Sequence, residues 1–79
     1  MGVVDDLADA LAKDAIEVAN KIGNDDVIYE TAKILSATSA TMQEAYMTSI
    51  RVRLAERRAR IFLAEQVQTV MPSSDTGGA

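Results

Sequence analysis

The sequence predicts an all-α protein, a helical hairpin in which a short N-terminal helix folds back on a long second helix. The 79 residues include only one proline and four glycines, so few residues interrupt a helix. Apolar residues recur at intervals of three and four, which is helical spacing. A chain of this length forms one small domain with a marginal core, and we expect it to associate with itself or with a partner.

The first helix is expected at about residues 4–22. Asp5 and Asp6 near its start suit the positive end of a helix dipole, and Gly23 supplies a C-terminal stop. Its polar face carries Asp6, Asp9, Lys13, Glu17 and Asn20. Its apolar face is formed by Val4, Leu7, Ala8, Leu11, Ala15, Val18, Ala19 and Ile22.

The second helix is expected at about residues 26–71, because Asn24 or Asp25 can cap it and no further breaker appears before Pro72. Hydroxyl side chains compete for backbone hydrogen bonds, and four of them crowd into residues 36–41. We expect one continuous helix there, since alanines separate the hydroxyls. A bend or break at 36–41, giving three helices, is the alternative. The domain then covers residues 1–72, followed by a disordered tail at 73–79.

The long helix has apolar residues on two opposite faces. A helix in a simple hairpin needs one such face, so the second predicts packing against another molecule in an oligomeric bundle, coiled coil or filament. The alternative is that the second face is ordinary exposed surface. The predicted interface residues are Tyr46, Ile50, Leu54 and Ile61 on the first face and Phe62 and Leu63 on the second, which also carries Val52, Ala55, Ala59 and Val70.

Charge is distributed unevenly along the chain. Residues 1–44 carry nine acidic and three basic groups, whereas residues 45–79 carry three acidic and five basic groups. All five arginines fall within ten residues: Arg51, Arg53, Arg57, Arg58 and Arg60. They have three interpretations: pairing with acids of the first helix to set register, an anion or nucleic-acid patch, or a solvated face.

Catalytic, metal and cofactor chemistry is not expected. The chain contains no histidine, cysteine or tryptophan, which removes the usual general bases, thiols and zinc ligands. The carboxylate pairs Asp5 with Asp9 and Asp25 with Asp26 stand at helix starts, where acids ordinarily act as caps. No glycine-rich phosphate loop is present. We therefore predict no catalytic residue, no metal and no cofactor.

These features together predict a non-enzymatic structural subunit whose partner is itself. One alternative is a small adaptor or co-chaperone that covers a helix of another protein. A second is an anion or nucleic-acid binder, although the net charge of −4 argues against nucleic acid. A membrane partner is disfavoured for the same reason. The lack of a signal peptide predicts a cytoplasmic protein, or one exported into an assembly without a cleaved signal.

Overall fold

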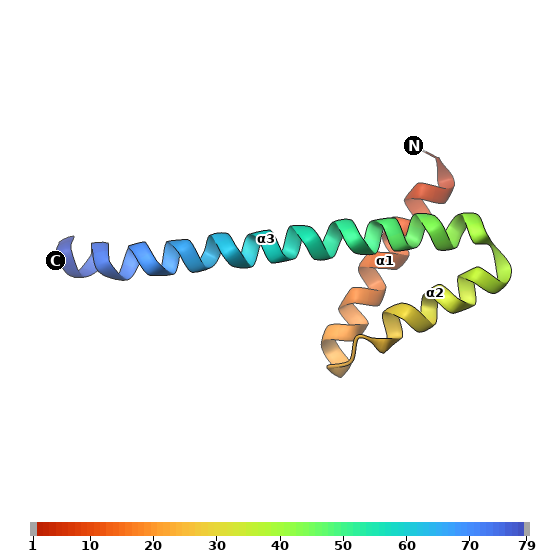
Figure 1. Cartoon of the computed structure of the whole chain (residues 1–79), viewed down its shortest axis with the longest axis horizontal. Helices are drawn as coiled ribbons and strands as arrows, with labels where there is room; N and C mark the ends of the chain where they lie inside the picture. The colour runs from red at the N-terminus through yellow and green to blue at the C-terminus, as the bar shows by residue number, and fades with distance from the viewer. Residues whose placement is uncertain (1, 79) are drawn as a thin grey trace.

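The computed structural model of the chain is built from three helices (Figure 1). They are α1 (Val3–Ile22), α2 (Asp26–Thr38) and α3 (Ala40–Gly78). The structure describes residues 2–78, with side chains described for residues 2–68. The all-α class is confirmed, and the described residues contain no strand. The disordered tail was predicted at residues 73–79, which lie outside the residues with described side chains. The disorder of this tail therefore remains a prediction.

Helix α1 begins and ends within one residue of the predicted bounds. Asp5 and Asp6 lie in its first turn, where carboxylates offset the positive end of the helix dipole. At its other end Gly23 adopts a left-handed backbone conformation with φ 70°, which glycine adopts without steric cost. The backbone N–H of Asn24 then donates to the carbonyl of Ala19 at 3.1 Å. The Asn24 side chain in turn accepts from the N–H of Asp26 at 2.9 Å, at the start of α2.

The expectation of one continuous helix over residues 26–71 is wrong, because the chain breaks at Ser39. This residue has an extended backbone, with φ −160° and ψ 104°. Its hydroxyl accepts from the N–H of Met42 at 3.2 Å, as a helix N-cap does. The preceding Thr38 hydroxyl donates to the carbonyl of Ile34 at 3.1 Å. The Ser39 hydroxyl thus accepts from an N–H that in a continuous helix would donate to the Thr38 carbonyl, and the Thr38 hydroxyl adds a side-chain bond to the last turn of α2.

The core of the three-helix packing is built on alanines of α1. Four alanines at intervals of four, three and four residues are buried there: Ala8, Ala12, Ala15 and Ala19. Side chains this small let helix backbones approach closely. Tyr46 and Ile50 of α3 are the largest fully buried side chains and pack with Ile28 and Ala32 of α2 in the same cluster. We call residues 3–54, which contain this core, the head.

Tyr46 joins α3 to α2 through a buried hydrogen bond. Its hydroxyl donates to the backbone carbonyl of Ile28 at 2.8 Å. Burial raises the pKa of the Tyr46 phenol, so the hydroxyl keeps its proton and its role as a donor.

The larger apolar residues of α1 are not all buried, which corrects the single face predicted for this helix. Val3, Leu7, Val18 and Ile22 are between 43% and 70% exposed. On a helical wheel at about 100° per residue they lie on one side of α1, next to the alanines rather than among them. The two neighbouring helices cover the alanine side and also contact Leu11 and Ile16, which are partly buried against the core. We call the four exposed residues the α1 stripe.

Helix α3 extends well beyond the head. All described residues from Ala55 to Gln68 are exposed, and we call residues 55–68 the arm. The radius of gyration is 17.5 Å, whereas a compact chain of this length would have about 12 Å. Figure 1 shows α1 crossing α3 near its N-terminal half and the rest of α3 projecting alone. No described helix has the length and hydrophobicity needed to cross a bilayer.

Replacing Tyr46 with phenylalanine is expected to lower the free energy of unfolding by about 1 kcal/mol, because the buried hydrogen bond is lost while the ring remains. Urea unfolding followed by circular dichroism measures this. Tyr29→Phe is the matched control, since Tyr29 is 53% exposed and its change should leave stability unaltered. Equal stability of Tyr46→Phe and the wild type would contradict the role given to this bond.

Replacing Ala12 with leucine is expected to destabilise the chain by about 1–3 kcal/mol, because a larger side chain cannot fit between closely packed helices without moving them. The change should lower the midpoint of thermal unfolding. Ala10→Leu places the same side chain at an exposed position of α1 and should be neutral. A neutral Ala12→Leu would mean that the helices do not depend on alanine for their approach.

Candidate protein-interaction surface

The six predicted interface residues fall into two groups in the structure. Tyr46 and Ile50 are buried in the head by helices of their own chain, and Leu54 packs half-buried against the same core. Ile61, Phe62 and Leu63 lie on the arm, where they are between 51% and 59% exposed. The first group therefore holds the single chain together. The second group is open to a partner.

Apart from Ile61 and Ala64, which lie on the opposite side of α3, the exposed apolar residues of the arm form a stripe that begins at the end of the head. On a helical wheel these residues cover about 140° of α3, on the side opposite the core-facing residues Ile50 and Leu54. We call this set the arm stripe: Val52, Ala55, Ala59, Phe62, Leu63 and Val67. Arg51 and Arg58 border it on one side, and Arg60 borders it on the other. A helix face of this composition suits contact with another helix.

The sequence analysis did not predict that Val67 belongs to the arm stripe or that the α1 stripe is exposed. Val67 continues the arm stripe one turn beyond Leu63 and is 55% exposed. Leu7, Val18 and Ile22 of the α1 stripe were placed on the same apolar face as the alanines, and Val3 was not placed on a face. The signal for the α1 stripe was the regular spacing of alanines in α1, because alanines at helical spacing mark the side of closest approach and leave the larger residues beside it.

One arginine of the cluster fixes α3 against α1. Arg53 donates to both carboxylate oxygens of Asp9, with Nε to Oδ1 at 2.9 Å and Nη2 to Oδ2 at 2.8 Å. This two-point geometry sets the orientation of both groups. The hydrogen bond from Arg53 lowers the pKa of Asp9 below its usual range, and the same bond raises the pKa of Arg53.

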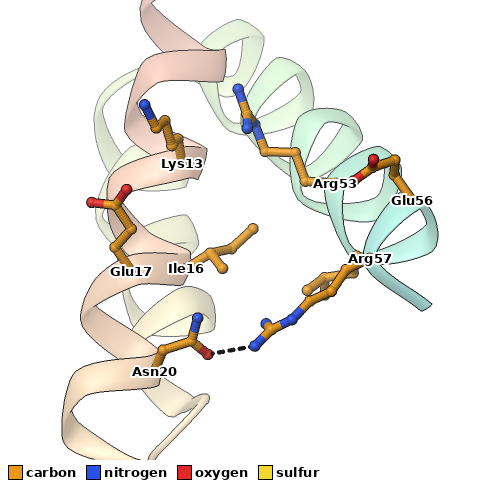
Figure 2. Close-up of a pocket in the computed structure, with 8 residues that line it drawn as sticks. Lys13, Ile16, Glu17, Asn20, Arg53, Glu56 and Arg57 are labelled. Carbon is orange, nitrogen blue, oxygen red and sulfur yellow. Dashed lines mark hydrogen bonds between the residues drawn. The ribbon is translucent and has the colours of Figure 1, made fainter. Parts of the chain in front are cut away.

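Two more arginines have partners within the chain. The Nη2 of Arg57 donates to Oδ1 of Asn20 in α1 at 3.1 Å, across the gap seen in Figure 2. Arg60 pairs with Glu56 one turn earlier on the arm. Arg51 and Arg58 are exposed. The pairing of arginines with side chains of the first helix therefore takes place within one chain for Arg53 and Arg57.

A groove of about 260 Å³ lies between α1 and α3 beside these contacts (Figure 2). Both signs of charge line it, from Lys13 and Glu17 on α1 to Glu56 and Arg57 on α3. Mixed charges without a shared focus give no preference for an anion or a cation. Among the described residues no group of three or more acidic, histidine or cysteine side chains gathers as metal ligands do.

Replacing Asp9 with asparagine is expected to make stability less dependent on pH in the acid range. The pKa of Asp9 is lower in the folded chain than in the unfolded one, so the ion pair stabilises the fold above about pH 4, and this contribution disappears as the pH falls through the folded-state pKa. Thermal unfolding midpoints at pH 7 and pH 3 test this. The variant should be less stable than the wild type at pH 7, and the difference should shrink at pH 3.

Asp14→Asn is the matched control, because Asp14 is an exposed carboxylate on the same helix. Its replacement should have no comparable pH-dependent effect. A constant difference between Asp9→Asn and the wild type across this pH range would contradict the assigned role of the ion pair.

No protein-family model matches the chain, and no curated protein or solved structure matches it significantly. The function has to be argued from the residues of this chain.

Proposed function

We propose that the protein is a non-enzymatic structural subunit that assembles with copies of itself through the arm. The observation that carries this proposal is the exposed arm stripe, centred on Phe62 and Leu63. Among the described residues, α1 and α2 pack along the head portion of α3, and Arg57, which contacts Asn20, lies on the side of the arm away from the stripe, so no described helix covers the stripe.

The energetics of an isolated helix support a partner for the arm. Most helices in proteins depend on tertiary packing for their stability, and short isolated helices are marginal in water. Covering a side chain such as Phe62 or Leu63 contributes about 1.5–3 kcal/mol when burial is complete. An arm packed against another chain therefore gains both helix stability and apolar burial.

The contacts of the arginines support self-assembly better than they support binding of a nucleic acid or another anion. Binding to a nucleic-acid backbone needs several cations free to face phosphates along one line. Arg53, Arg57 and Arg60, the three that share one side of α3, are each engaged with a side chain of the same chain. Arg51 and Arg58 instead border the arm stripe, where they suit the polar rim of a protein interface.

An adaptor for a different protein would use the same arm stripe. The two functions differ in what the purified chain does alone, since a self-assembling subunit needs no second component. The following measurement separates them.

Light scattering of the purified chain over a concentration series is expected to give a mass that is a multiple of 8.5 kDa. Phe62→Asp should remain helical but reduce the mass to that of one chain, because a carboxylate in an apolar contact is left without a partner. The weight-average mass checks assembly, and far-UV circular dichroism on the same samples checks folding.

Ala64→Asp is the matched control. It introduces the same charge two residues away on the opposite side of the arm, so it should assemble as the wild type does. A wild-type chain that stays monomeric at every concentration would exclude self-assembly and favour the adaptor.

A further inference from the structure

We propose that the arm stripe of one molecule packs against the α1 stripe on the head of a second copy. This inference rests on the proposed self-assembly and specifies its contact. The interface is formed by two different surfaces, so each copy contributes its head to one interface and its arm to another. Pairing of two identical arms is the competing arrangement.

Both surfaces carry exposed apolar residues and are of similar length, and each includes one exposed acidic residue, Asp14 on α1 and Glu56 on the arm. The α1 stripe runs from Val3 to Ile22, about 28 Å along the helix, and the arm stripe from Val52 to Val67 runs about 23 Å. The exposed members of the two stripes include Leu7 and Ile22 on the head and Phe62 and Leu63 on the arm. One contact along their length would cover both sets of residues.

The two helical segments that carry the stripes have opposite net charges. Helix α1 holds five acidic and two basic residues, a net charge of −3, whereas residues 51–68 hold five basic and two acidic residues, a net charge of +3. Asp9 and Arg53 neutralise each other within one chain, which leaves −2 and +2. Packing two arms together would place like charges side by side, while packing an arm on α1 brings opposite charges together.

The chain cannot make this contact with itself. Helix α3 passes without interruption from the head into the arm, so the arm points away from its own α1 stripe and cannot fold back. A contact between two different surfaces leaves one head and one arm free after each addition. Such contacts build a ring if the rotation closes and a filament if it does not.

A complementation experiment with two variants tests the arrangement. Phe62→Asp disables the arm and keeps the head, whereas Leu7→Asp disables the head and keeps the arm. Leu7 is 56% exposed, so its replacement spares the core, and circular dichroism confirms folding of both variants. Each variant alone should have the mass of one chain, and an equimolar mixture should have twice that mass. Val18→Asp serves as a second head variant, and Tyr29→Asp, outside the stripe, should assemble like the wild type.

The outcomes separate this inference from the proposed function. Leu7→Asp and Val18→Asp chains that assemble as well as the wild type would show arm-to-arm pairing, which overturns the inference and leaves self-assembly standing. Monomeric variants that stay monomeric when mixed would also overturn it. A monomeric wild type removes the proposed function and this inference together.

Discussion

The close approach of α1 to the other two helices, made possible by its buried alanines, is the constraint on which the rest of the structure depends. Alanine offers little apolar area, so this contact contributes less burial per residue than leucine would. The small alanine side chains instead allow the backbone of α1 to lie close to α2 and α3. Because α1 lies close, Tyr46 and Ile50 are sealed in the core, and Asp9 comes within hydrogen-bond distance of Arg53. The same arrangement leaves Val3, Leu7, Val18 and Ile22 exposed.

The bonds across the head fix orientation more than they supply stability. Asp9 and Arg53 are both partly exposed, and exposed ion pairs contribute little to folding. Their two-point geometry and the second contact from Arg57 to Asn20 instead hold α3 at a defined crossing over α1. The Tyr46 hydroxyl does the same between α3 and α2. Two polar contacts between α1 and α3 and one between α2 and α3 thus fix the direction of the arm relative to the head.

The sequence predicted the helices more reliably than the surfaces they present. The bounds of α1 and the stop at Gly23 followed from local chemistry, since glycine is the residue that enters a left-handed conformation freely. The break at Ser39 was the less favoured of two alternatives, because hydroxyls lower helix propensity only slightly and the decision depends on whether α2 gains by packing on α3. Periodicity showed that α1 has apolar residues on one broad side. Which half of that side is covered depends on neighbouring helices, and the local signal for it was the regular spacing of the alanines in α1.

The unbroken passage of α3 from head to arm has a mechanical consequence. A continuous helix acts as a stiff lever, so any rotation of the head is passed on to the arm and enlarged with distance. The 14 residues of the arm measure about 21 Å, and a tilt of about 10° at its base therefore displaces its far end by about 4 Å. In an array of such subunits the same tilt recurs at every joint. Small adjustments in the packing of α1 against α3 would then accumulate into the curvature of the whole array.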